Sequence, residues 1–173
     1  MSGGRASKTQ PEESANQEFI FRREYLVPRE LVAAAWTDPE RMAQWWGPHE
    51  FTNPVCELDT RPGGRLRIDM HGPDGTVYPM TGAYEIVEPD RVAFSCLPLD
   101  EHGEPLFEVL NVVTFVEHAG GTIQTVRARV RRVSPGATIH FAGMEAGWSQ
   151  SLERLGDLLA PSRPLCAAVS ARS

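Results

Sequence analysis

Paired cysteines and metal-binding motifs are both missing from this sequence. Its three cysteines, Cys56, Cys96 and Cys166, are odd in number and irregularly spaced, which argues against a disulfide framework. The spacings typical of zinc sites, such as CxxC and HExxH, do not occur. We therefore expect free thiols in a reducing compartment, and no metal or other cofactor.

Long apolar segments are missing as well. No stretch approaches the roughly 20 apolar residues that a membrane-spanning helix needs. The first ten residues, MSGGRASKTQ, lack the apolar run of a signal peptide. The net charge of −6 disfavours nucleic acid and anionic membranes as partners. These observations predict a cytoplasmic protein that neither inserts into membranes nor binds nucleic acid.

The 173 residues are enough for one domain of ordinary size. Residues 1–17 are small and polar, which predicts a disordered leader. Residues 161–173 begin with a proline and contain a second one three residues later, which predicts a flexible tail. The single folded domain is expected to span residues 18–160.

Six segments have the composition or alternation of β-strands. They are residues 18–27, 65–71, 76–87, 91–97, 106–117 and 122–133. Short turns rich in glycine, proline and aspartate separate the last five, so consecutive strands must be antiparallel. Leu66, Ile68 and Met70 alternate with charged residues, which indicates one dry and one wet face. The pattern predicts an antiparallel sheet of about six strands.

Three helices are expected beside this sheet. Pro28 and the pair Asp38-Pro39 are suited to begin two short helices after the first strand. Residues 142–159 predict a longer helix with an apolar stripe, formed by Met144, Trp148, Leu152, Leu155 and Leu159. Only the dry face of the sheet is large enough to bury this stripe. The predicted fold is α+β, with a curved sheet wrapped around a long C-terminal helix.

Four segments carry a resemblance to a known family. They are WTDPERMAQWWGPHEF (36–51), residues 62–94 from PGGRLRIDM to RVAF, HAGGT (118–122), and Gly147-Trp148 with the leucines that follow. Together they resemble the activator-of-heat-shock-protein-ATPase homologues, the AHSA-type branch of the SRPBCC (START-like) superfamily, over nearly all of residues 19–159. The resemblance implies a helix-grip fold with an interior cavity. Members named for the co-chaperone role carry a second domain that binds the chaperone, and only short tails flank this domain, which argues against a chaperone partner.

Nine residues are expected to contact a ligand in that cavity. Large amphipathic rings at a pocket rim suit an apolar ligand with a polar end, and methionines add a polarisable lining. The predicted ligand-binding residues are Trp46, His49, Phe51, Met70, Tyr78, Met80, Phe94, Met144 and Trp148. The alternative for the tryptophans and methionines is ordinary core packing. Gly143 and Gly147, each costing roughly 1 kcal/mol in a helix, indicate a close approach to the sheet or space left for a ligand.

The strand at 106–117 has two alternative registers. One turns Phe107, Val109, Asn111, Val113 and Phe115 inward, and the other turns Glu108, Leu110, Val112 and Thr114 inward. A buried Glu108 would have a raised pKa and could act as a general acid or base, whereas an exposed Glu108 would pair with an arginine. Of the five histidines, His102 and His118 fall in turns and His71 ends a strand. Only His49 and His140 are expected near the ends of the cavity, and neither has a Ser, Cys or Asp partner at motif spacing. No catalytic residue is therefore assigned.

Three functions remain open at this point. The favoured one is binding of an apolar or amphipathic small molecule in the cavity. The second is a protein-interaction domain, co-chaperone-like or self-associating into a homodimer through an exposed edge strand such as 18–27. The third is an enzyme of the cyclase, dehydratase or hydrolase kind, which requires at least two ionisable groups that converge in the cavity.

Overall fold

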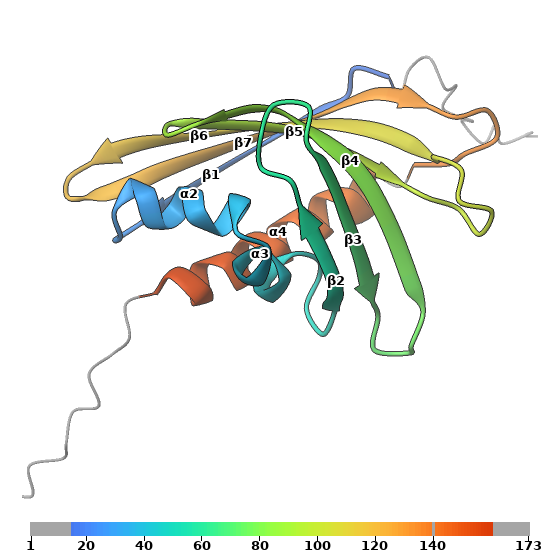
Figure 1. Ribbon diagram of the computed structural model, residues 1–173, viewed down its shortest axis with the longest axis horizontal. Helices are drawn as coiled ribbons and strands as arrows, with labels where there is room; N and C mark the ends of the chain where they lie inside the picture. Colours follow the sequence, from blue (N-terminus) through green and yellow to red (C-terminus); the bar gives the residue numbers. More distant parts are fainter. Residues whose placement is uncertain (1–14, 140, 161–173) are drawn as a thin grey trace, which may run out of the picture.

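A seven-stranded antiparallel sheet dominates the computed structural model, which describes residues 15–139 and 141–160 (Figure 1). The strands are β1 (Glu18–Tyr25), β2 (Thr52–Leu58), β3 (Arg65–His71), β4 (Val77–Glu88), β5 (Arg91–Pro98), β6 (Phe107–His118) and β7 (Gly121–Val133). Their order is β1-β7-β6-β5-β4-β3-β2, and all neighbouring pairs are antiparallel. The chain therefore forms a meander from β2 to β7, and β1 extends the sheet beyond β7.

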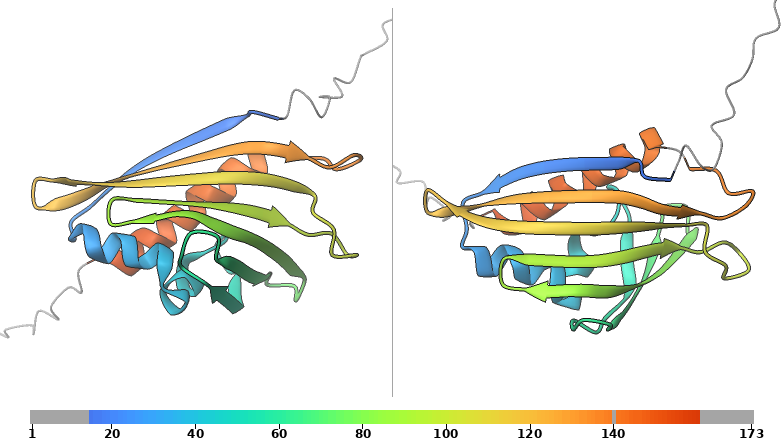
Figure 2. Two further views of the ribbon diagram at one scale, coloured as in Figure 1. Left: turned by 45° about the horizontal axis from the view of Figure 1, so that its top comes forward. Right: turned by 90° about the horizontal axis from the view of Figure 1, so that it is seen from above.

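Three helices lie on the concave side of this sheet. Helices α2 (Arg29–Thr37) and α3 (Pro39–Trp45) follow β1, and the long helix α4 (Phe141–Leu159) lies across the concave face, as Figures 1 and 2 show. The Asp38 carboxylate caps α3 by accepting hydrogen bonds from the backbone N–H groups of Glu40 (2.9 Å) and Arg41 (3.4 Å). The predicted helix-grip fold is confirmed. None of the helices in the described ranges is long and apolar enough to cross a membrane.

Strand β2 is the element that the sequence pattern does not predict. Pro54 lies inside it and lacks the backbone N–H that a central strand needs. The structure places β2 at the edge of the sheet, where it pairs with β3 and its register shifts between Thr52 and Val55. An edge position and an irregular register are the two settings in which a strand tolerates proline.

The predicted leader and tail lie largely outside the described residues, as do His140 and Cys166. At the start of the described chain, the Asn16 N–H donates to the Val130 carbonyl (2.8 Å), and the Val130 N–H donates to the Gln17 carbonyl (2.9 Å). Backbone pairing with β7 therefore begins two residues before the predicted boundary at residue 18.

The hydrophobic core consists of two clusters. The larger one joins the sheet to α2, α3 and the C-terminal half of α4, and Trp36, Trp45 and Leu155 are fully buried in it. The smaller one is formed by Val109, Ala128 and Val130 of β6 and β7, against which the first turn of α4 packs. Phe19 and Trp148 pack against both clusters. Trp148 therefore marks the place on α4 where the two clusters meet.

A buried polar network fixes α2 inside the larger cluster. The Trp36 indole N–H donates to the Gln124 side-chain oxygen (2.8 Å), and the Gln124 amide nitrogen donates to the Tyr25 hydroxyl (3.4 Å). The Tyr84 hydroxyl donates to the Trp36 carbonyl (2.9 Å). Burial raises the pKa of Tyr25 to about 12, so this hydroxyl stays neutral at physiological pH. These bonds tie α2 to β1, β4 and β7.

Candidate functional site

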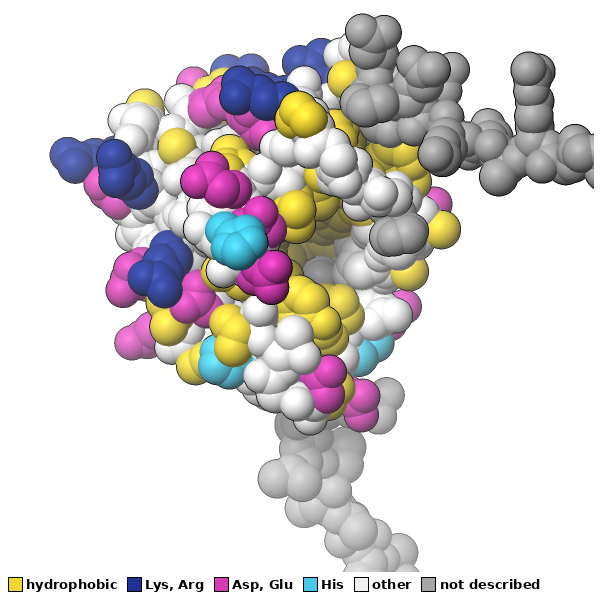
Figure 3. Space-filling view, turned by 90° about the vertical axis from the view of Figure 1, so that its right-hand side faces the viewer, with side chains coloured by type: hydrophobic (Ala, Val, Ile, Leu, Met, Phe, Trp, Pro, Cys, Tyr) yellow, Lys and Arg dark blue, Asp and Glu magenta, His cyan; other side chains and the backbone are white. Residues whose placement is uncertain are grey.

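An open cavity of about 180 Å³ lies between the sheet and the N-terminal half of α4. Figure 3 shows the hollow on the right-hand side of the molecule in Figure 1, with hydrophobic walls and with acidic side chains along part of its rim. Fourteen of the residues that the structure describes line it: Trp46, Gly47, Pro48, Met70, Met80, Cys96, Pro98, Phe107, Val109, Asn111, Met144, Gly147, Trp148 and Ser151. Because the lining includes members of both core clusters, the cavity lies where these clusters meet.

Five of the nine predicted ligand-binding residues lie on the cavity wall. They are Trp46, Met70, Met80, Met144 and Trp148. The two indoles pack edge to face with their ring centroids 5.5 Å apart. Aromatic faces and thioethers therefore provide much of the apolar surface that a ligand would contact.

The other four predicted residues lie outside the lining. Phe94 is fully buried in the larger cluster, with its ring centroid 6.0 Å from that of Trp46. Phe51 and Tyr78 pack against each other, with ring centroids 5.7 Å apart. His49 is half exposed, and its Nε2 lies 2.7 Å from a carboxylate oxygen of Glu153 on α4. His49 thus contacts the outside of α4 instead of the cavity.

Several wall residues were not among the predicted ligand-binding residues, although the sequence carries signals for them. Ser151 lies three residues after Trp148, so helical spacing places both on the same side of α4. Phe107 and Val109 belong to one of the two registers considered for the 106–117 strand. Cys96 shares a strand face with Phe94, two residues further along β5. Pro98 lies two residues after Cys96 on the same face of β5, but just beyond the predicted strand, which ends at residue 97.

The turn after α3 forms one wall of the cavity. Gly47 has a φ of 91°, and a Cβ atom at this position would lie 3.1 Å from the Met70 sulfur. The backbone conformation therefore favours glycine here, and any side chain at this position would press against Met70. The Asn53 amide nitrogen donates to the Trp46 carbonyl at 2.7 Å, and the Arg154 guanidinium donates to the same carbonyl at 3.0 Å. This wall is held by hydrogen bonds from β2 and α4.

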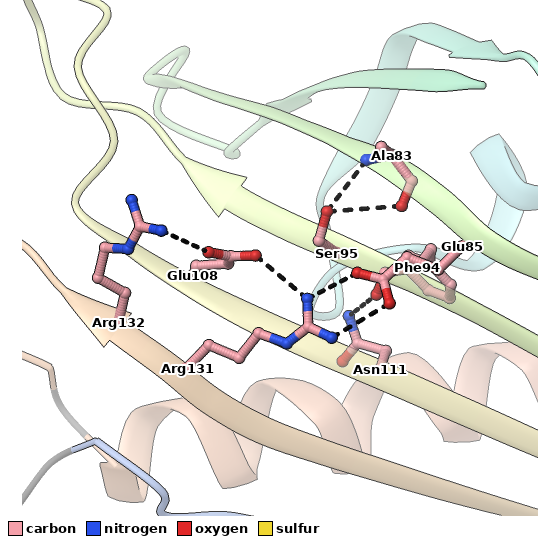
Figure 4. A network of polar contacts seen from close by, with 8 residues as sticks. All are labelled: Ala83, Glu85, Phe94, Ser95, Glu108, Asn111, Arg131 and Arg132. Atoms are coloured by element: carbon pink, nitrogen blue, oxygen red, sulfur yellow. Dashed lines mark hydrogen bonds and ion pairs between the residues drawn. The ribbon is translucent and has the colours of Figure 1, made fainter. Parts of the chain in front are cut away.

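The register of β6 settles the two alternatives for Glu108 and Asn111. Asn111 is buried and lines the cavity, whereas Glu108 lies on the opposite face of the sheet. There the Glu108 carboxylate is 3.5 Å from Arg131 and 3.8 Å from Arg132, and Arg131 also pairs with Glu85 (Figure 4). The structure therefore shows the ion-paired Glu108, and the interpretation as a general acid or base at the cavity is wrong.

Cys96 is the one titratable side chain among the fourteen lining residues. Burial raises the pKa of its thiol, and the hydrogen bond from the Asn111 amide nitrogen (3.2 Å to Sγ) opposes this shift. The thiol therefore stays protonated and is a weak nucleophile at neutral pH. Within residues 15–139 and 141–160, no group of three or more His, Cys, Asp or Glu side chains is placed to hold a metal ion.

Comparison with solved structures finds the same fold in bacterial proteins. A protein from Chromobacterium violaceum superimposes with a TM-score of 0.73 at 25% identity, over 83% of this chain and 97% of the other. One from Mycobacterium smegmatis gives 0.71 at 28% identity, over 91% and 97%. The AHSA1 protein from Silicibacter pomeroyi gives 0.69 at 25% identity, over 82% and 96%. None of the curated proteins matches the chain.

A family model covers most of the chain. Residues 26–160 match the model described as Activator of Hsp90 ATPase homolog 1-like protein. The matched range begins directly after β1 and includes all the residues that line the cavity and all of α4. The chain therefore belongs to the Activator of Hsp90 ATPase homolog 1-like protein family, the AHSA-type branch of the SRPBCC superfamily that the sequence resembles.

Proposed function

We propose that this protein binds a small, mainly apolar molecule in the cavity beneath α4. The observation that carries this proposal is the unfilled space of about 180 Å³ with largely apolar walls. Protein interiors are otherwise packed as densely as organic crystals. An engineered apolar cavity of about 150 Å³ is known to hold benzene. Pockets for drug-sized ligands measure about 300–1,000 Å³, so the ligand here is expected to be close to a single ring in size.

Gly147 supports the proposal because it keeps space open at the cavity wall. A Cβ atom built at this position would have Pro48 as its nearest neighbour, at 3.9 Å. Alanine would therefore fit, and it would stabilise the helix by about 1 kcal/mol relative to glycine. Of the two explanations for this glycine, space left for a ligand agrees with the geometry, and close approach to the sheet does not.

The lining favours binding over acid–base catalysis. A cyclase- or hydrolase-type reaction needs at least two ionisable groups that act on the same substrate. Of the fourteen lining residues Cys96 alone is ionisable, and burial holds its thiol in the protonated form. The protein-interaction alternative makes a different prediction, because it requires no small molecule in the cavity.

Toluene provides a direct test, since it is close to benzene in size and carries no polar group. The wild-type protein is expected to bind toluene, as measured by calorimetry or by an increase in the denaturation midpoint. Native mass spectrometry of the purified protein would show whether a ligand co-purifies with it. If toluene and other single-ring compounds leave the protein unchanged, the proposal fails, and a protein partner becomes the better explanation.

Substitution of Gly147 by alanine is expected to separate stability from binding. The free energy of unfolding should rise by about 0.5–1 kcal/mol, because alanine favours the helix. Toluene should bind several-fold more weakly, because the new methyl group lies at the cavity wall. Urea unfolding and calorimetry measure the two quantities.

Gly156→Ala is the matched control on the same helix. Gly156 is outside the cavity lining, and a Cβ atom there would be 3.8 Å from a ring carbon of Tyr25, an ordinary contact. The control should gain similar stability and keep the wild-type affinity for toluene. Equal affinities in the two variants would show that toluene does not occupy the space beside Gly147.

A further inference from the structure

Asn111, a residue of the cavity wall, carries a buried polar atom without a partner. Asn111 is 1% exposed, and its amide nitrogen lies 3.5 Å from the Phe94 carbonyl oxygen and 3.2 Å from the Cys96 sulfur. Because a carbonyl oxygen only accepts hydrogen bonds, the amide nitrogen must face it, and the amide oxygen turns away (Figure 4). This oxygen is buried and has no hydrogen-bond partner among the described residues.

A buried acceptor without a partner costs about 1–3 kcal/mol, so a donor is expected to reach it. The Ser151 hydroxyl on the cavity wall does not supply one, because it already donates to the Gly147 carbonyl at 2.8 Å. A bound water needs two to four polar partners, whereas most of the surrounding wall is apolar. A donor carried by an otherwise apolar ligand satisfies the Asn111 oxygen and fills the space at the same time.

The lining also selects the chemical class of that ligand. The acidic side chains in Figure 3 lie at the rim, and none of the fourteen lining residues carries a carboxylate. A cationic donor at the buried Asn111 oxygen would therefore have no counter-charge beside it, which is strongly unfavourable. The donor must therefore be neutral. Trp46 and Trp148 offer ring faces and edges, and the sulfur atoms of three methionines favour aromatic neighbours by about 0.3–1.5 kcal/mol each. An aromatic ring suits this wall better than an alkyl chain does.

We infer that the cavity binds a neutral aromatic hydroxyl compound of about the size of phenol, whose hydroxyl donates a hydrogen bond to Oδ1 of Asn111. The inference rests on the proposed function, because it needs a cavity that accepts a single ring. It adds a specificity-determining residue and a ligand class to that function.

The test compares phenol with toluene in the full-length wild type and in Asn111→Leu. Leucine has the same branched arrangement of heavy atoms as asparagine, although its methyl groups are bulkier, and it cannot accept a hydrogen bond. Phenol is expected to bind about tenfold more weakly to the variant, because one hydrogen bond of about 1.4 kcal/mol is lost. Toluene should bind at least as well as before. Ser95→Ala is the matched control, since Ser95 is another buried polar residue of the sheet and lies outside the cavity lining, and both affinities should stay near wild type.

A second measurement needs no substitution and decides the question if Asn111→Leu does not fold. In wild-type protein labelled with ¹⁵N, phenol should shift the side-chain amide signals of Asn111 far more than toluene does. Equal shifts with the two ligands, or equal losses of affinity in Asn111→Leu, would overturn the role of Asn111 and leave the cavity proposal standing. Failure of both ligands to bind the wild type would instead overturn the proposed function itself.

Discussion

Replacing Trp148 with alanine is expected to lower the free energy of unfolding by about 3 kcal/mol and to make the protein bind larger aromatic compounds. Trp148 packs against three rings of the core, with centroid distances of 5.5 Å to Trp46, 6.0 Å to Phe21 and 6.2 Å to Trp36. It also forms part of the cavity wall. Removal of the indole therefore costs core contacts and enlarges the cavity in the same step.

Indole is the natural probe for this enlarged cavity. At a concentration about 100 times its Kd, indole should restore about 2.7 kcal/mol of the stability lost in Trp148→Ala. Thermal or urea unfolding with and without indole measures this effect. Leu155→Ala is the matched control, because Leu155 is fully buried on the same helix and lies outside the cavity lining. It should lose a similar stability, about 3 kcal/mol, without rescue by indole. Equal rescue of both variants, or of neither, would contradict the placement of Trp148 at the cavity.

The sheet and α4 were predictable because their signals are local. Alternation along a strand and helical spacing along α4 depend only on neighbours in the sequence, and both patterns are strong here. The apolar stripe of α4 predicted that Met144 and Trp148 face the sheet, and both residues lie on the cavity wall. Strand β2 was not predictable in this way, because Pro54 interrupts the pattern and the edge position that tolerates it is a property of the whole sheet.

The cavity residues show where local patterns stop being informative. Phe94 and Cys96 point to the same face of β5, but only Cys96 reaches the cavity. Phe94 lies two residues nearer the start of the strand, where Trp36 and Trp46 cover it, with centroids 6.0 Å away in both cases. Alternation predicts the face on which a side chain lies. The packing of the helices on the curved sheet decides which part of that face stays uncovered.

Arg154 illustrates the same limit, because its partners are more than 100 residues away in the sequence. Its Nη1 atom lies 3.0 Å from each of the carbonyl oxygens of Trp46, Gly47 and Pro48, and its Nη2 atom lies 3.0 Å from that of Gln44. A cation at the C-terminal end of a helix satisfies carbonyls that have no partner within the helix. Arg154 thus joins α4 to the end of α3 and to the turn that forms the cavity wall.

Arg154→Ala is therefore expected to lower the free energy of unfolding by about 2–3 kcal/mol, because charged donors are lost from several partly buried carbonyls. Arg154→Lys should recover only part of this loss. An ammonium group has a single nitrogen, so it cannot reach all the carbonyl oxygens that the two guanidinium nitrogens contact. Toluene binding should weaken in both variants, because the wall formed by Trp46, Gly47 and Pro48 is no longer fixed. Urea unfolding and calorimetry provide the two measurements.

Arg91→Ala is the control for removal of an arginine as such. Arg91 makes an exposed ion pair with Glu88 at 3.3 Å, and exposed pairs of this kind contribute less than about 1 kcal/mol. A loss in Arg154→Ala no larger than in Arg91→Ala would show that the four carbonyl contacts contribute little to stability. A full stability loss with unchanged toluene affinity would show that the turn keeps its shape without Arg154. Only a combined loss supports the conclusion that α4 both covers the cavity and holds its opposite wall in place.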